Sequence, residues 1–323
     1  MGGDIKMLKV RSTPNLYGVT LMGDYDDLDK LYDSISNYLA FYQDNSVWFP
    51  YPEYEYMLSL NYDIRHCYQG DRGYEAVDNC ADRFEAYGSP DYGLPAESRK
   101  EYRKLYKDFK NGNLYYKVEI LYPLILHYMI TFEQILEDEP TEDWLDTENE
   151  VGDKWSERYS MIDAMRDRAA ISHLVSLFWE NLQDVLGREK AAALHRYYIT
   201  NECPIPSAIY CDALIHCQLV NFEEMTREEK LDFLLAAAYE IMGVEDIEEY
   251  PDEHEEDADL YNAATERLNT GKHRRFPVRQ AFYEAMDEAF DPSKPMYRNE
   301  FDQFLNDRYG VDPNPFETGD FEW

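Results

Sequence analysis

The sequence contains no apolar run of about 18 residues, the length needed to cross a membrane as a helix, so we expect no membrane span. Its opening residues, Met1-Gly2-Gly3-Asp4, lack the basic and apolar regions of a signal peptide. These absences predict a cytoplasmic protein. Met7 offers an alternative start, which would make residues 1–6 an extension.

Basic residues are scarce: 31 lysines and arginines face 66 aspartates and glutamates, for a formal net charge of −35 at pH 7. A negative field of this size repels phosphate backbones and anionic membranes, so we expect no direct binding to nucleic acid or membrane. The charge fits basic proteins, cations, or nucleic-acid-binding proteins whose groove would accept an acidic decoy. The simpler interpretation is that the charge keeps the protein dispersed.

Cysteine is also sparse, and no two cysteines have the close spacing of a metal site. The five are Cys67, Cys80, Cys203, Cys211 and Cys217. Their odd number and wide spacing predict free thiols in a reducing compartment. Catalytic sequence patterns are missing too, since no HExxH, P-loop, GxGxxG or GxSxG occurs. We therefore expect neither a bound metal nor a cofactor.

Apolar residues make up 44% of the 323-residue chain, enough for a sizeable core and one or two domains. The chain is also rich in tyrosine, with 29 residues. Tyrosine combines apolar area with a polar tip, so it suits either a binding surface or half-buried structural positions.

The first part of the chain shows the period-two alternation of β-strands. Two short alternating segments, at residues 8–10 and 17–21, flank a turn signal that begins at Pro14. Residues 56–65 alternate most regularly, and residues 114–122 alternate after a second turn signal. Together these segments predict a small sheet.

Two helices are expected in the same part of the chain. Apolar residues recur at helical spacing over residues 28–42, and Asp26 or Asp27 is expected to cap this helix. Residues 124–136 follow Pro123, which suits a first helical turn. They are apolar on most sides, so we expect this second helix to be buried.

An acidic stretch at residues 137–153 contains Pro140 and Gly152 and indicates a domain boundary or a long surface loop. Beyond it no convincing strand occurs. Helices are expected at residues 171–185, 188–198, 231–241, 282–290 and 301–305.

These patterns predict an α+β fold, with a small mixed or antiparallel N-terminal sheet and packed helices followed by a mainly helical C-terminal region. The expected divisions are an α+β domain at residues 7–140, a helical domain at 154–309 and an extended C-terminal tail at 310–323. No internal repeat is found.

Several short segments of the N-terminal part carry a resemblance. They are TPNLYGV at 13–19, GDYDDL at 23–28, LY at 31–32, YDIRH at 62–66, GDR at 70–72, and YYKVEI at 115–120. In these segments the chain resembles an uncharacterised bacterial family, found mostly in Firmicutes, that opens in this way. The resemblance covers about residues 7–140. It implies an α+β fold and a bacterial or phage origin, and it names no catalytic residue.

The densest mixture of reactive side chains lies near the end of the regular alternation. Its members are Asp63, Arg65, His66, Cys67, Asp71 and Arg72. If residues 56–65 form a strand, Asp63 and Arg65 share its polar face, where the pair would hold an anion or orient a general base. His66 titrates near neutral pH, which suits proton transfer. The alternative interpretation is a salt bridge on a solvated sheet face beside a packed histidine.

The other histidines form no comparable cluster. His127 and Glu133 lie six residues apart on an expected helix, a spacing that does not align two metal ligands on one face. His173, His195 and His216 each lie alone on expected helices. We interpret each of them as a core or surface histidine.

Two runs of acidic residues remain. One occupies residues 133–153, and the other lies between two expected helices, where it should form an exposed loop. The second run comprises Glu245, Asp246, Glu248, Glu249, Asp252, Glu253, Glu255, Glu256, Asp257 and Asp259. Each run is either a solvated loop or a patch for a basic partner, where it would raise the association rate and the specificity.

Three hypotheses on function follow. The first is a non-enzymatic binding protein with an acidic, tyrosine-bearing surface, in one version an inhibitor in bacterial or phage conflict that occupies a nucleic-acid-binding groove. The second is an enzyme or small-ligand-binding protein that uses the region of Asp63, Arg65 and His66. The third is a structural scaffold. A pocket around Arg65 would favour the second, and a convex acidic stripe would favour the first.

Overall fold

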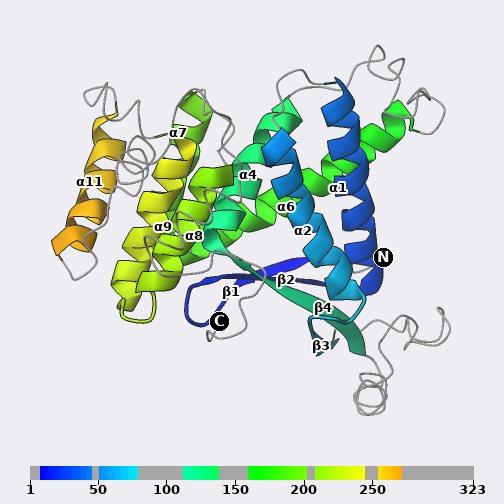
Figure 1. Ribbon diagram of the computed structural model, residues 1–323, viewed down its shortest axis with the longest axis horizontal. Helices are drawn as coiled ribbons and strands as arrows, with labels where there is room; N and C mark the ends of the chain where they lie inside the picture. The colour runs from blue at the N-terminus through cyan, green and yellow to red at the C-terminus, as the bar shows by residue number, and fades with distance from the viewer. Residues whose placement is uncertain are drawn as a thin grey trace, which may run out of the picture. The chain divides into compact units, whose positions relative to one another are not determined.

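The computed structural model describes residues 8–45, 51–78, 112–137, 159–201, 208–243 and 254–270 (Figure 1). The helices expected at residues 282–290 and 301–305, and the tail at 310–323, lie outside the described residues. Nearly all of the acidic stretch at 137–153 lies outside them as well.

An antiparallel sheet of four strands forms from the N-terminal part of the chain. The strands are β1 (Lys9–Ser12), β2 (Gly18–Gly23), β3 (Gly73–Asp78) and β4 (Gly112–Leu121), in the order β1-β2-β4-β3. Helices pack on the sheet, and the rest of the described chain is mostly helical, which confirms the α+β fold. β3 was not predicted from the sequence; it pairs with β4 in a register that sets Gly73 opposite Lys117.

The turn between β1 and β2 is fixed by Thr13. Its backbone N–H donates to the Gly18 carbonyl at 2.9 Å, and the Gly18 N–H donates to Thr13 Oγ1 at 3.1 Å. Leu16 adopts a left-handed φ of 61° within the turn. Gly18 then passes so close to β4 that an added Cβ would lie 1.9 Å from the Ile120 carbonyl oxygen. The expected turn is confirmed, and only glycine fits where it ends.

Helix α1 (Tyr25–Asn45) is capped by Asp24, so the sequence prediction of Asp26 or Asp27 as the cap is wrong. Asp24 Oδ1 accepts a hydrogen bond from the Asp27 N–H at 3.0 Å, and the Asp24 carbonyl accepts one from the Leu28 N–H at 3.1 Å. Asp26 and Asp27 instead occupy the first turn, where negative charge complements the helix dipole.

Residues 56–65, expected to form a strand, belong to helix α2 (Tyr51–Tyr68), which packs against α1 (Figure 1). Leu60 lies four residues after Tyr56, and positions four apart fit both a strand period of two and a helical period of 3.6. Met57 and Asn61 decide the matter, because both are buried although a strand would turn them to the polar face. The prediction was wrong because the apolar alternation coincided with a helical face.

Six further helices complete the described chain. They are α4 (Tyr122–Glu137), α6 (Met161–Leu186), α7 (Arg188–Thr200), α8 (Ala208–Asn221), α9 (Arg227–Met242) and α11 (Glu255–Thr270). Gly187, with a φ of 86°, separates α6 from α7, and Gly243, with a φ of 92°, ends α9. The helices expected at 124–136, 171–185, 188–198 and 231–241 are thereby confirmed. A helix was expected at His216, where α8 lies, but without bounds, and α11 was not predicted. No helix in the described part of the chain is both long and apolar enough to cross a membrane.

The chain forms two compact units, and each is assembled from several segments. The first consists of Met1–Arg11, Thr20–Glu119 and Ile135–Leu177, and the second of Ser12–Val19, Ile120–Gln134 and Phe178–Trp323. Both units therefore take segments from before and after the acidic stretch. The linear division at 7–140 and 154–309 stays a prediction.

Within the second unit, the turn after β1 is held by side chains from two helices far along the chain. Gln218 of α8 donates from Nε2 to the Tyr17 carbonyl at 2.6 Å. Lys230 of α9 donates from Nζ to the Asn15 carbonyl at 3.0 Å and lies 5.2 Å from the Tyr17 ring centroid and 5.3 Å from that of Phe222. A segment quoted for the family resemblance is therefore a docking point for the C-terminal helices.

Candidate functional site

Five of the residues singled out in the sequence meet where α2 ends and the chain turns into β3. Backbone hydrogen bonds from Gly70 N–H to the Cys67 carbonyl (3.0 Å) and from Asp71 N–H to the His66 carbonyl (3.1 Å) fold the chain back on the helix end. Gly70 permits this turn because its φ is 84°. We call the resulting cluster the α2–β3 corner; it comprises Tyr62, Asp63, Arg65, His66, Asp71 and Arg72.

Two ion pairs cross this corner. Arg72 Nη2 lies 2.6 Å from Asp63 Oδ1, and His66 Nδ1 lies 2.8 Å from Asp71 Oδ2. The sequence predicted an Asp63–Arg65 pair instead. That pairing was wrong, because residues two apart on a helix point about 200° away from each other, whereas on a strand they share a face.

Asp63 is largely buried, with 14% of its side chain exposed. Burial raises the pKa of its carboxyl above the ordinary value, and the charge and hydrogen bond of Arg72 only partly oppose the effect. Burying the Asp63 carboxylate therefore costs desolvation free energy, and the ion pair with Arg72 reduces that cost.

Arg65 and His66 both lie against the ring of Tyr62. Its ring centroid lies 4.2 Å from that of His66, and the guanidinium carbon of Arg65 lies 5.3 Å from the same ring. The three residues are spaced i, i+3 and i+4, so they share one helical face. Tyr62 is 49% exposed, which places this face in solvent.

Cys67 takes no part in this exposed face. The residue is completely buried, and burial together with the charge of Glu119 raises the pKa of its thiol. A thiol in this state is a poor nucleophile. The structure thus gives no support to a nucleophilic dyad of Cys67 and His66.

Lys117 adds a further cation from β4. Gly73 leaves room for it: a Cβ added there would lie 2.6 Å from Lys117 Cε, so the lysine side chain runs across the glycine. Gly73 follows Arg72 directly, which brings this part of β4 next to the corner.

The second candidate, the acidic run at residues 245–259, is only partly described. Its first six acids, Glu245, Asp246, Glu248, Glu249, Asp252 and Glu253, lie outside the described residues. The remaining four form the first turns of α11 rather than a loop, which corrects the expectation for them. Acids at a helix N-terminus complement the dipole, so a charged run also suits a helix start.

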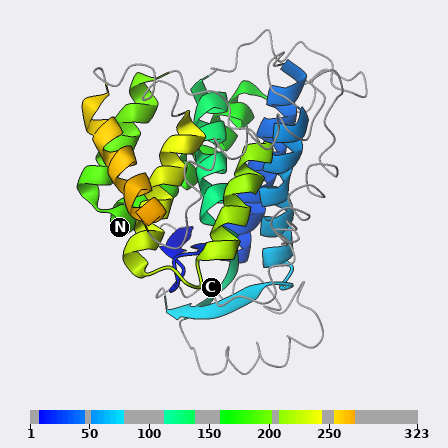
Figure 2. The same cartoon turned by 60° about the vertical axis from the view of Figure 1, so that its left-hand side comes forward.

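Contacts from α7 and α9 fasten α11 within the second unit (Figure 2). Arg196 Nη2 lies 2.9 Å from Glu256 Oε2, and Tyr239 donates to Asp257 Oδ1 at 2.7 Å. Near the other end of α11, Arg267 binds Asp232 through two hydrogen bonds of 2.5 and 2.6 Å. Asp232 is 5% exposed, so this bidentate pair is largely desolvated.

Tyrosines also satisfy a buried carboxylate between these helices. Glu240 of α9, 3% exposed, accepts hydrogen bonds from the hydroxyls of Tyr210 and Tyr261. The structural interpretation of the tyrosine content therefore holds for this part of the chain. No feature of the sequence pointed to Glu240, because its partners are 21 and 30 residues away.

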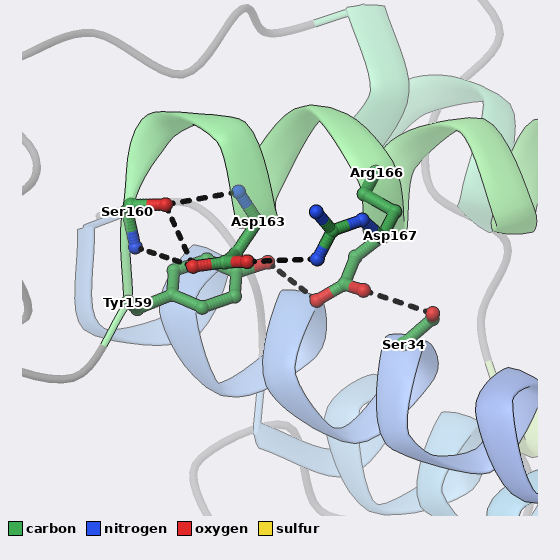
Figure 3. Close-up of polar contacts among 6 residues, drawn as sticks. All are labelled: Ser34, Tyr159, Ser160, Asp163, Arg166 and Asp167. Atoms are coloured by element: carbon green, nitrogen blue, oxygen red, sulfur yellow. Dashed lines mark hydrogen bonds and ion pairs between the residues drawn. The ribbon is translucent and has the colours of Figure 1, made fainter.

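A buried carboxylate that the sequence analysis missed lies in the first unit, at the start of α6 (Figure 3). Asp167 accepts hydrogen bonds from Ser34 Oγ of α1 at 2.9 Å and from the Tyr159 hydroxyl at 2.8 Å. Burial raises the pKa of Asp167, and the hydrogen bonds oppose that effect. Asp163, beside it, forms a capping box with Ser160 and pairs with Arg166, so its pKa is lowered.

The remaining histidines are dispersed. His127 is buried, with Nδ1 3.4 Å from Thr131 Oγ1, while the exposed His195 meets the Trp179 ring edge-on at 4.9 Å. Trp179 also donates to Glu133 Oε1 at 3.0 Å. His173 is half-buried on α6, and the side chain of His216 lies outside the described residues. Among the described residues, no three His, Cys, Asp or Glu side chains are grouped to hold a metal ion.

A family model described as a domain of unknown function, DUF6904, matches residues 8–273. The chain belongs to this family. Neither a curated protein nor a solved structure matches it. Membership confirms the resemblance to an uncharacterised family and extends it well beyond residues 7–140.

The DUF6904 match includes both candidate regions, the α2–β3 corner and α11. The matched range therefore includes segments of both compact units. Its description assigns no activity, so function must be argued from the side chains themselves.

Proposed function

We propose that this chain is a non-enzymatic, acidic protein-binding protein whose partner is basic and docks on the start of α11. The observation that carries the proposal is the fastening of α11. Arg196, Tyr239 and Asp232 hold it at three points, while Glu255 and Asp259 remain exposed. A helix that is already fastened loses little backbone freedom on binding, which favours its exposed carboxylates for recognition.

The net charge of −35 supports the same function. A strongly negative protein attracts basic partners over several ångströms and speeds their encounter. Within the second unit, Glu256 is 72% exposed even though it pairs with Arg196. The acidic turn is therefore available to an incoming lysine or arginine.

A more specific form of the proposal is an inhibitor or decoy in bacterial or phage conflict. Proteins that bind nucleic acids carry basic grooves, and an acidic surface competes for such a groove. On this proposal the chain itself binds no nucleic acid, and it displaces DNA or RNA from its partner. A gel shift of the partner with duplex DNA should then be reversed by adding this chain.

Reversing Glu255 and Asp259 to lysine is expected to slow association with the captured partner by about tenfold or more at low salt, because steering by exposed charges acts on the on-rate. The partner is recovered by affinity capture from the native host and identified by mass spectrometry. Association is then followed at low and at physiological ionic strength, where the difference should shrink because exposed charges are screened.

The matched control replaces Glu180 and Asp184, two exposed acids on α6, with lysine. It changes the net charge by the same amount as the α11 variant. It should reduce the on-rate much less than the α11 variant. Equal on-rates in both variants would mean that only the overall charge matters, and an unchanged on-rate in the α11 variant would refute the proposed surface. Glu256 is left in place because a lysine there would face Arg196.

A further inference from the structure

Arg65 has no acidic partner in the described part of a chain that carries 66 acids and 31 bases. Among the described residues, no carboxylate pairs with it, and its Nε is buried without a hydrogen-bond acceptor. The two acids of the corner are already engaged, Asp63 by Arg72 and Asp71 by His66. Both carboxylates of the corner therefore have partners other than Arg65.

The contacts of Arg65 and His66 leave hydrogen-bonding groups on both side chains unengaged by the described residues. A guanidinium stacked on an aromatic ring keeps the N–H donors along its edge free for two parallel hydrogen bonds to an oxyanion. Arg65 is held this way over Tyr62, and His66 lies against the same ring. Because Asp71 engages His66 at Nδ1, the ring's Nε2 is left for a ligand.

The helix dipole accounts for part of this arrangement. Arg65 and His66 lie in the last turn of α2, where positive charge is favourable by about 0.3–1 kcal/mol. The dipole requires no particular orientation of either side chain, however. It also does not satisfy the buried Nε of Arg65, a donor of the kind that native proteins rarely leave unpaired.

We propose that Tyr62, Arg65 and His66 form a binding site for the phosphate or carboxylate group of a small molecule. Arg65 binds the oxyanion through its free edge, and His66 donates from Nε2 when protonated. Asp71 holds the imidazole in place, and Asp63 holds Arg72 away from Arg65. The site shares no residue with α11, so its test can fail without contradicting the proposed partner surface.

Inorganic phosphate and acetate are the probes, added at fixed pH and with ionic strength matched by chloride. The readout is the proton NMR signal of the His66 ring, assigned by its disappearance in His66→Gln. We expect a saturable shift with at least one probe. Preference for phosphate would indicate a phosphorylated ligand, and preference for acetate a carboxylate ligand.

Arg65→Gln should weaken that binding by about tenfold or more, as the loss of charge-assisted hydrogen bonds implies. Arg65→Lys should restore it only in part, because lysine keeps the charge but not the fork. The matched control is Arg166→Gln, which removes an exposed arginine already paired with Asp163 and should leave binding unchanged.

Three outcomes would overturn the proposal: no saturable shift with either probe, equal weakening by Arg65→Gln and Arg166→Gln, or full rescue by Arg65→Lys. If Arg65→Gln does not fold by circular dichroism, Tyr62→Ala provides the second test. It removes the ring that positions Arg65 and His66 and should also weaken binding.

Discussion

Replacing Gly18 with alanine is expected to lower the free energy of unfolding by about 3 kcal/mol or more, the upper range for forced overpacking. The new Cβ would lie 1.9 Å from the Ile120 oxygen, 2.6 Å from the Ile120 carbonyl carbon and 2.8 Å from Leu121 Cα. All three are backbone atoms of a paired strand, so no side chain can move aside. A urea titration followed by circular dichroism measures the effect.

Alanine substitutions at two other glycines are the controls for this clash. At Gly73 the three atoms nearest to the added Cβ belong to the Lys117 side chain and not to the backbone, and at Gly187 it would meet nothing within 4 Å despite a φ of +86°. Alanine at either position should cost about 1 kcal/mol, from side-chain adjustment or from left-handed backbone strain. If Gly18→Ala unfolds at the same urea concentration as these controls, the close approach to β4 is not what demands glycine.

Asp167→Asn is expected to raise the unfolding midpoint at pH 7, by a free energy on the order of 1 kcal/mol, the usual scale for one substitution. Burial raises the pKa of Asp167 in the folded chain, so the ionised form is disfavoured there relative to the unfolded chain. Its contribution to stability therefore increases as pH falls from neutrality through the raised folded pKa, and levels off below the unfolded value of about 4. Asparagine keeps the size of the side chain without the charge and should flatten this dependence.

The groups that face Asp167 act in the same direction. From α1, Asp33 has a raised pKa, caused by its own burial and by the charge of Asp167, and Asn37 and Ser34 supply hydrogen bonds. On its own side lie Asp163 and the Tyr159 hydroxyl. No lysine or arginine among the described residues pairs with Asp167, so protonation is what relieves the repulsion.

Asp163→Asn is the control with the opposite sign (Figure 3). Hydrogen bonds from Ser160 lower the pKa of Asp163, so its contribution is present above the unfolded pKa and is lost as the pH falls through the folded one. This variant should be less stable than the wild type at pH 7 and should converge with it in acid. Thermal unfolding between pH 4 and 7 compares the two; a stability of Asp167→Asn that falls at pH 7 would contradict the assignment.

Three strands of the sheet, β1, β2 and β4, and several helices were predictable because their signals are local. The turn after Pro14, the strand at 114–122 and the helix that ends at Gly243 each combine a periodic pattern with a residue that stops it. α2 was misjudged because its apolar residues fit two periods at once. Only the burial of Met57 and Asn61, which a sequence does not display, separates the two.

The candidate site was located but its pairing was not. The residues of the α2–β3 corner lie within eleven positions of one another, so the sequence was enough to group them. The partner of each side chain depends on whether the backbone is helix or strand. Because a strand was predicted, Arg65 was expected to pair with Asp63, whereas Arg72 does so in the structure. α11 escaped notice because three of its five buried residues, Ala258, Ala264 and Thr265, are small or polar.

The hydrogen bond from Gln218 to Tyr17 has a consequence for synthesis on the ribosome. The two residues are 201 positions apart, and at about 5–20 residues per second roughly 10–40 s separate their translation. The hairpin turn is therefore made early but cannot dock until α8 and α9 have been translated. During that interval Tyr17 remains accessible to chaperones, and the second unit completes its folding only late in translation.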